Sequence, residues 1–202
     1  VLTRMDKKNI LSVKNLKKIY SKQHNGKTYA LNDLNLDVKE GEIFGLLGPN
    51  GAGKTTFINI LAGTVIKTGG EVNVCGFDLD ENPRQVRASV GVVPQEVNLD
   101  PFFSPRKLLE LQAGLYGVKE KDRITDTILN LVSLEKEANS YARSLSGGMK
   151  RRLLMAKALV HQPPLVFLDE PTAGVDVELR QNLWKNVRML NKLGVTIILT
   201  TH

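Results

Sequence analysis

The glycine-rich segment at residues 48–55 constrains the fold of this chain more than any other feature. It reads G-x-x-x-x-G-K-T, the pattern of a phosphate-binding loop, and it lies between an apolar run at 42–47 and a helix-like run at 56–62. Glycines let the backbone curl until N–H groups point at phosphate oxygens, and the helix start adds free N–H groups and a positive dipole end. We therefore expect a strand, loop and helix that hold the phosphates of a nucleotide.

Two side chains of this loop carry specific chemistry. Lys54 is placed to reach the β- and γ-phosphates, and the hydroxyl of Thr55 suits Mg²⁺. The predicted contacts with the nucleotide come from Gly48, Pro49, Asn50, Gly51, Ala52, Gly53, Lys54, Thr55 and Thr56. Kinases, GTPases, helicases and transport ATPases share this loop, so the motif alone predicts only a nucleotide.

Composition sets the broad class. A chain of 202 residues can bury most of its apolar surface as one domain, with or without a subdomain. Cys75 is the only cysteine, which excludes a disulfide within the chain and favours a reducing compartment. No apolar run approaches the roughly 18 residues that span a bilayer, and no signal peptide is expected at the N-terminus.

The net charge is +7, with basic residues clustered at 14–22 and 150–152. No aromatic-rich stripe accompanies these charges, so no nucleic-acid partner is expected. A solvated basic face and proximity to an anionic membrane surface both remain open.

Apolar patterns along the chain predict an α/β protein. Strands are expected at 10–20, 30–38, 71–74, 90–93, 165–168 and 195–200, and helices at 83–88, 149–160 and 178–193. From 104 to 134 the pattern becomes helical, with Leu108, Leu109, Leu111 and Leu115 crowded on one side. We interpret this stretch as a small α-subdomain inserted into the α/β core.

The apolar run at 165–168 ends in two carboxylates, Asp169 and Glu170. A buried strand that stops at paired acids puts charge at the carboxyl edge of the sheet, where α/β folds bind ligands. Asp169 would orient Mg²⁺ through a water. Glu170 would accept a proton from the attacking water or orient it, a role worth about a hundred- to ten-thousandfold in rate. Two solvated acids in a turn are the alternative, which the preceding phosphate-binding loop disfavours.

Residues 145–149 suggest a second anion-binding element. Ser146, Gly147 and Gly148 open a helix, and the free N–H groups of a helix start attract anions. One nucleotide needs only one such cradle. Two cradles make sense if two chains pair head to tail, each offering its second cradle to the other's nucleotide. Taken alone, the segment is better interpreted as an ordinary serine cap with a Gly-Gly hinge.

Taken together, these segments resemble the ATP-binding cassette (ABC) ATPases over nearly the whole chain, in order and at similar spacing. Residues 48–55 match the Walker A loop, 145–149 the LSGGQ signature and 165–169 Walker B, with Glu170 as the catalytic glutamate.

The resemblance also implies roles for residues that no other pattern singles out. Gln95 matches the Q-loop, residues 173–176 match the D-loop, and His202 matches the switch histidine. Tyr20 lies where the family places the aromatic side chain that stacks on adenine, and Tyr29 is the second candidate.

For the architecture, the resemblance implies one nucleotide-binding domain over residues 1–202, of class α/β. A P-loop NTPase core with a mostly parallel sheet and an N-terminal antiparallel β-subdomain would occupy about 1–95 and 160–202. The helical subdomain would occupy about 96–155. Since family members usually continue past the histidine, the sequence is expected to be truncated at its C-terminus.

For the chemistry, the resemblance implies ATP and Mg²⁺ as cofactors. Lys54, Gln95, Glu170 and His202 would carry catalysis. Thr55, Gln95 and Asp169 would organise the metal. Ser146, Gly147 and Gly148 would cap the γ-phosphate held by a second copy of the chain.

The implied partners are that second copy and an integral membrane permease subunit, at the cytoplasmic face of the plasma membrane. The basic residues at 150–152 resemble those of ATPase subunits that power export of drugs, lipids or polysaccharides. Phe102 and Phe103 either contact the permease or pack inside the α-subdomain. Met149 stands where the signature usually has glutamine, which removes a polar contact without removing the backbone contacts.

Three other functions stay open at this point. An importer ATPase would carry the same motifs. A non-transport ABC protein acting on ribosomes or chromosomes is disfavoured by the single cassette and the lack of heptads at 56–164. A GTPase is disfavoured because residues 191–194 have Gly194 where a guanine-reading motif needs an acid.

Overall fold

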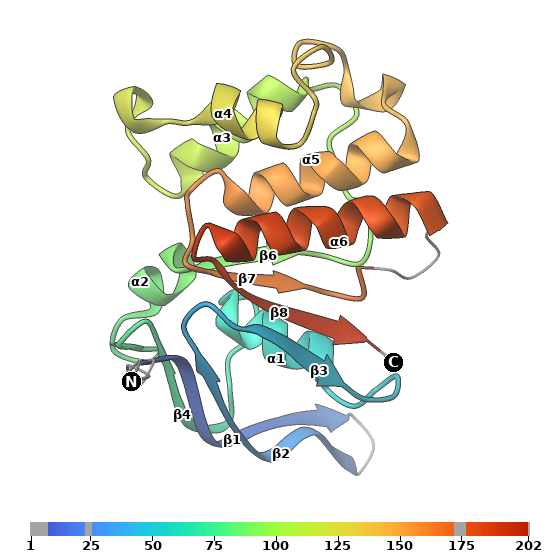
Figure 1. Ribbon diagram of the computed structural model, residues 1–202. Coiled ribbons are helices and arrows are strands. Elements are labelled where there is room, and N and C mark those ends of the chain that lie inside the picture. Colours follow the sequence, from blue (N-terminus) through green and yellow to red (C-terminus); the bar gives the residue numbers. More distant parts are fainter. Residues whose placement is uncertain (1–7, 23–25, 172–176, 202) are drawn as a thin grey trace, which may run out of the picture.

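The computed structural model describes residues 8–22, 26–171 and 177–201, which form two β-sheets with helices between and around them (Figure 1). The antiparallel sheet has the strand order β2-β1-β4-β5, and the parallel sheet has the order β3-β8-β7-β6. The strands are β1 (Asn9–Lys22), β2 (Gly26–Lys39), β3 (Ile43–Leu47), β4 (Gly69–Val74), β5 (Phe77–Asp78), β6 (Val90–Val93), β7 (Leu165–Leu168) and β8 (Thr196–Thr201).

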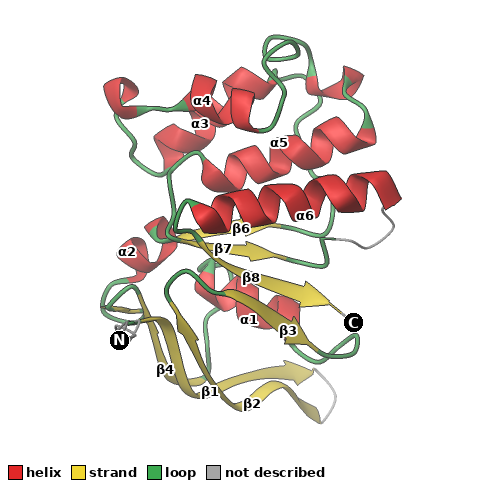
Figure 2. Ribbon diagram, viewed as in Figure 1, coloured by secondary structure: helices red, strands yellow, loops and turns green. Residues whose placement is uncertain are grey.

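Helices cover both faces of the parallel sheet (Figure 2). They are α1 (Lys54–Leu61), α2 (Pro83–Ala88), α3 (Pro105–Leu115), α4 (Thr125–Leu131), α5 (Gly147–Leu159) and α6 (Val177–Lys192), with 3₁₀ turns at Glu120–Asp122 and Ala142–Ser144. Helix α1 lies between the two sheets, whereas α5 and α6 cover the opposite face, with α3 and α4 beyond them (Figure 2). This arrangement confirms the expected α/β fold class. Among the described residues, no helix is long and apolar enough to cross a bilayer.

The strand β7 shows how the two faces of the parallel sheet are packed. All four of its residues are buried, and they alternate between two apolar clusters. Leu165 and Phe167 pack with α1 and the antiparallel sheet, and the rings of Phe167 and Phe57 meet edge to face, 6.1 Å between centroids. Val166 and Leu168 pack with the helices on the other face. A continuous apolar run is therefore required here, because both faces of the strand are covered.

The segment between β6 and β7 contains the helices α3, α4 and α5, and its polar contacts tie α3 to α4. Ser104 caps α3 by accepting a hydrogen bond from the Lys107 backbone N–H, 3.3 Å away. The Thr125 hydroxyl and the Arg123 guanidinium both donate to Glu110, the latter over 2.6 Å. Those two hydrogen bonds lower the pKa of the Glu110 carboxyl, and the one from Thr125 has the larger effect.

One expectation about α3 was wrong. Leu108 and Leu109 are buried, but Leu111 is 43% exposed and Leu115 is 82% exposed. Positions 108 and 109 face the core cluster, and the four leucines do not share one apolar side. The expected division into a core and a helical subdomain puts one boundary between about residues 155 and 160, at the C-terminal end of α5, and the division stays a prediction.

Helix α5 approaches the parallel sheet closely at Gly91 in β6. A Cβ atom at Gly91 would lie 2.3 Å from the carbonyl oxygen of Ala158. No real side-chain atom fits at that distance, so glycine is required for α5 to rest on β6.

We expect Gly91→Ala to destabilise the protein by about 1–3 kcal/mol, because the helix must move away from the strand. The matched control is Gly114→Ala inside α3, where a Cβ makes only an ordinary 3.6 Å contact with Arg123. That change should stabilise by about 0.5–1 kcal/mol. Urea unfolding midpoints compare the two, and equal midpoints would contradict the close-contact interpretation.

Candidate functional site

The phosphate-binding loop joins β3 to α1, as expected from its sequence. Gly51 and Gly53 have φ angles of 81° and 91°, in the left-handed region that favours glycine. A Cβ atom at Gly53 would also lie 2.2 Å from the carbonyl oxygen of Ala30 in β2. Gly53 is the residue before α1, so β2 and the turn into α1 fit together only if this position is glycine.

A small cavity of about 140 Å³ lies within this loop. Its lining consists of Ala30, the loop residues 49–56 and Glu170. Pockets that hold a whole small ligand usually measure about 300–1,000 Å³. The cavity therefore suits a phosphate group rather than an entire nucleotide, most of which would lie outside it.

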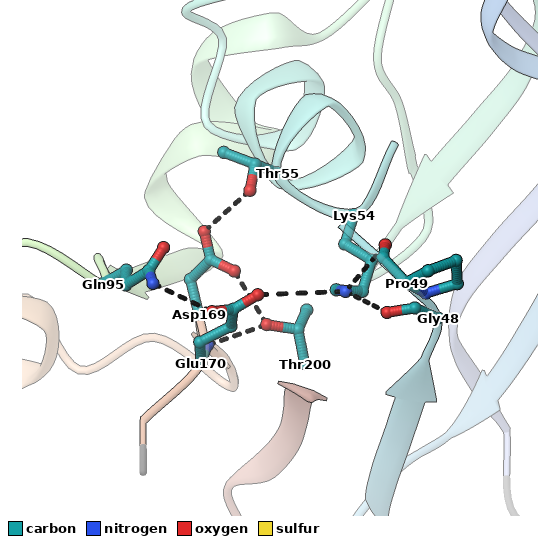
Figure 3. Close-up of polar contacts among 8 residues, drawn as sticks. All are labelled: Gly48, Pro49, Lys54, Thr55, Gln95, Asp169, Glu170 and Thr200. Atoms are coloured by element: carbon teal, nitrogen blue, oxygen red, sulfur yellow. Dashed lines mark hydrogen bonds and ion pairs between the residues drawn. The ribbon is translucent and has the colours of Figure 1, made fainter. Parts of the chain in front are cut away.

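Lys54 lies in this cavity with its ammonium group turned onto the loop (Figure 3). Its Nζ donates to the carbonyl oxygens of Gly48 and Pro49, the latter 3.3 Å away. The same Nζ is 3.8 Å from the Glu170 Oε1. The residue is only 8% exposed, so its charge depends on these nearby oxygens rather than on water.

Asp169 lies directly after β7 and faces the start of α1. Its Oδ2 accepts a hydrogen bond from the Thr55 hydroxyl over 3.2 Å, and its Oδ1 accepts one from the Thr200 hydroxyl over 2.7 Å. The structure thus brings together Thr55 and Asp169, two of the three residues that the sequence assigned to Mg²⁺, although 114 residues separate them in the chain (Figure 3).

Glu170 lies beside Asp169, with its side chain between Gln95 and Lys54 (Figure 3). The Gln95 Nε2 donates to the Glu170 Oε2 over 2.9 Å, and the Glu170 backbone N–H donates to the Thr200 hydroxyl over 2.8 Å. Its φ angle is 46°, in the left-handed region that a glutamate rarely adopts. The surrounding contacts hold this conformation, which places the carboxylate at the loop cavity.

Thr200 is the site residue that the sequence analysis missed. Its side chain is fully buried near the end of β8, where its one hydroxyl donates to Asp169 and accepts from the backbone of Glu170. A hydroxyl residue directly after the apolar run 197–199 is the signal that could have pointed to it. Thr200 reaches the two acids only because β8 pairs with β7, and the sequence alone does not predict that pairing.

The charged side chains beside the loop cavity suit the binding of a divalent cation. Asp169, Glu170 and Lys54 are all nearly buried, and two carboxylates against one ammonium leave a net negative charge. The described residues contain no cluster of three or more His, Cys, Asp or Glu side chains that could hold a metal by themselves. Mg²⁺ does not need such a cage, because it keeps waters and shares one or two protein oxygens with substrate phosphates.

The second expected cradle lies apart from this cavity. The Ser146 hydroxyl caps α5 by accepting from the Met149 backbone N–H over 3.2 Å. Gly147 is the first residue of the helix, and a Cβ atom there would meet nothing within 4 Å. Neither these residues nor Gly148 line the loop cavity. The Met149 side chain packs against the core cluster between α3, α4 and α5.

Two residues predicted to contact adenine, Tyr20 and its alternative Tyr29, are not among the residues that line the cavity. Tyr20 is 41% exposed in β1 with the Lys18 ammonium over its ring, 4.8 Å from the centroid, and it does not line the cavity. Tyr29 is exposed on β2. His202 and the expected D-loop at 173–176 lie outside the described residues. The roles assigned to them stay predictions.

Comparison with known proteins places this geometry in a family. The family model described as ABC transporter matches residues 31–173, well over half of the chain. The chain belongs to the ABC transporter family. This confirms the resemblance found in its motifs, and with it the expected class of P-loop ATPases.

Curated relatives include two bacterial export proteins. The chain is 43% identical over 195 residues to Nod factor export ATP-binding protein I of Cupriavidus pinatubonensis, which covers 96% of this chain and 58% of the relative. It is 40% identical over 196 residues to the protein of the same name from Cupriavidus metallidurans, which covers 96% of this chain and 63% of the relative. The chain therefore spans about three fifths of these relatives.

Solved structures share the fold. The ATP-binding cassette MJ0796, in a dimeric post-hydrolysis state bound to ADP and Pi, superposes with a TM-score of 0.81 at 30% identity, covering 95% of this chain and 88% of that one. The cbiO1 protein from Clostridium perfringens, part of the ABC transporter complex cbiONQ, has a TM-score of 0.80 at 30% identity, covering 96% and 78%.

We expect Thr200→Val to slow ATP hydrolysis by about ten- to a hundredfold, because it frees the two acids from their shared anchor. The matched control is Thr196→Val on the same strand, which removes a buried hydroxyl that only accepts from the Gly41 backbone. Both changes should cost about 1–3 kcal/mol of stability. Steady-state ATPase assays separate them, and equal rates in the two variants would contradict the anchoring role.

Proposed function

We propose that this chain is the ATP-binding and ATP-hydrolysing part of an ABC exporter, which works as a dimer with a separate membrane subunit. The observation that carries the proposal is the meeting of Lys54, Thr55, Gln95, Asp169 and Glu170 at one edge of the parallel sheet, beside a cavity of phosphate size. Phosphoryl transfer needs mainly positioning and charge neutralisation, and these residues supply both.

Each residue has a definite task in this proposal. The loop backbone and Lys54 hold the phosphates, and the Lys54 donors turn from the Gly48 and Pro49 carbonyls to phosphate oxygens. Thr55 and Asp169 would hold Mg²⁺, which would neutralise charge on the phosphates. Glu170 takes the proton of the attacking water or orients it, while Gln95 fixes the carboxylate by its hydrogen bond.

The proposed dimer follows from the incomplete site. The loop cavity receives no residue from the start of α5, although that helix offers Ser146, Gly147 and Gly148 as a second set of phosphate donors. A symmetric pair of chains would place this helix start over the partner's nucleotide. MJ0796, which has the same fold, has a solved dimeric structure.

Two further observations support export through a membrane partner. The relatives in Cupriavidus are named as export ATP-binding proteins. In addition, Phe102 is 66% exposed, Phe103 is 39% exposed and Tyr141 is 56% exposed, on two segments joined by a hydrogen bond from the Ala142 N–H to the Phe103 carbonyl oxygen. An exposed aromatic group of this kind favours a contact with another protein over packing inside the helical subdomain. In this proposal the protein acts at the cytoplasmic face of the plasma membrane.

The first test changes the proposed catalytic carboxylate. We expect Glu170→Gln, in the full-length protein, to slow ATP turnover by about a hundred- to ten-thousandfold and to accumulate an ATP-bound dimer. Light scattering after size exclusion measures the mass, with Glu120→Gln on the exposed 3₁₀ turn as the charge-matched control. A variant that stays monomeric with saturating ATP and hydrolyses at the normal rate would overturn the role of Glu170.

A second test asks whether two chains share each site. Lys54→Ala destroys one cradle, and Gly147→Glu should destroy the other without harming the fold, because position 147 has open space and an acid suits a helix start. Each variant alone should be inactive. An equal mixture should recover roughly a quarter of normal activity, since half of the dimers carry one intact site of two.

Recovery that depends on protein concentration supports the shared site. If the mixture stays as inactive as its components while each variant remains folded by circular dichroism, the shared site is refuted. If Gly147→Glu alone keeps full activity, the second cradle has no role in hydrolysis.

A further inference from the structure

A second, larger cavity of about 590 Å³ lies between α5, α6 and the turn that follows α4. Four cationic side chains line it: Arg152 from α5 and Lys185, Arg188 and Lys192 from α6. We call this cavity the basic groove. It shares no lining residue with the phosphate-binding loop.

The basic groove concentrates positive charge without a counter-charge. The other side chains in its lining are Leu131, Val132, Ser133, Asn186 and Met189, none of them acidic. Within the described part of the chain, none of the four cations forms an ion pair. Cations gathered around one cavity repel one another, so their arrangement favours a bound anion.

Arg152 gives a second and independent sign of a ligand. Its Nε atom is buried and has no hydrogen-bond partner. Buried polar nitrogen atoms almost always have a partner, because leaving one unpaired costs about 1–3 kcal/mol. Arg152 is also one of the residues that line the groove. Since water does not reach Nε, the Arg152 side chain must turn before an acceptor in the groove can satisfy that atom.

We propose that the basic groove binds a phosphate-bearing anion, with Arg152 as its central ligand. A guanidinium presents a planar fork of N–H donors that matches two phosphate oxygens, and it does so better than an ammonium group. The volume lies within the range usual for small-ligand sites. Free polyphosphates and the phosphate of a lipid headgroup share this chemistry, so the test must distinguish the two sources.

Helix α5 links this groove to the proposed catalytic site. Arg152 lies less than two turns beyond Ser146 on the same helix, and Ser146 caps the end that would meet the partner's nucleotide. An anion held by Arg152 therefore binds to the element that carries the second cradle. The groove itself does not depend on that role.

The test removes charge from α6 and leaves the proposed catalytic residues untouched. In the full-length protein, Arg188→Gln with Lys192→Gln takes two cations from the groove. The control, Lys119→Gln with Lys121→Gln, takes two exposed cations from elsewhere. Inorganic pyrophosphate is titrated calorimetrically in saturating MgADP, so that the loop is filled. In a second arm, flotation measures binding to phosphatidylcholine vesicles with and without phosphatidic acid.

We expect the groove variant to bind pyrophosphate roughly tenfold more weakly or worse, while the control binds normally. Arg152→Lys, which keeps the charge and loses the fork, should also weaken binding. A selective loss in the pyrophosphate arm identifies a free phosphate compound, and a selective loss in the vesicle arm identifies a lipid headgroup.

If the groove variant and the control behave alike in both arms, the proposal is overturned, because binding then follows total charge or does not occur. Neither arm requires ATP hydrolysis. The test of the basic groove can therefore fail or succeed independently of the test of the proposed ATPase activity.

Discussion

Two carboxylates buried side by side at the end of β7 are the constraint on which the site depends. Asp169 and Glu170 would repel each other and lose solvation unless donors surrounded them. The structure supplies hydroxyls from Thr55 and Thr200, an amide from Gln95 and an ammonium from Lys54. These donors come from the start of α1, from β8 and from the segment after β6. Satisfying two acids thus fixes these three parts of the chain relative to the end of β7.

Much of this arrangement was predictable from local sequence, for physical reasons that the structure makes clear. The phosphate-binding loop was found because its glycines are required by left-handed φ angles and by the close approach of Ala30. The strand β7 was found because burial on both faces demands an unbroken apolar run. The pair Asp169 and Glu170 followed from that run, since polar residues end it at the carboxyl edge.

Other parts depend on pairings that local sequence does not encode. Thr200 reaches the acids only because β8 pairs with β7, which brings it to Glu170 and Asp169, 30 and 31 residues earlier in the chain. The hydrogen-bond partner of Gln95 was not predictable either, because its amide donates to Glu170, which lies 75 residues further along the chain. Leu111 and Leu115 were misjudged because apolar spacing in α3 does not reveal which side the rest of the chain covers.

Helix α5 has a mechanical consequence that goes beyond its individual contacts. Its 13 residues make a rod about 20 Å long. At one end Ser146 caps it, and near the other end the Ala158 carbonyl rests on Gly91 of β6, which leads directly to Gln95. Rigid rods transmit tilt. In the proposed dimer, a displacement of the serine end would press α5 on β6 at Gly91, and β6 leads to the glutamine that donates to Glu170.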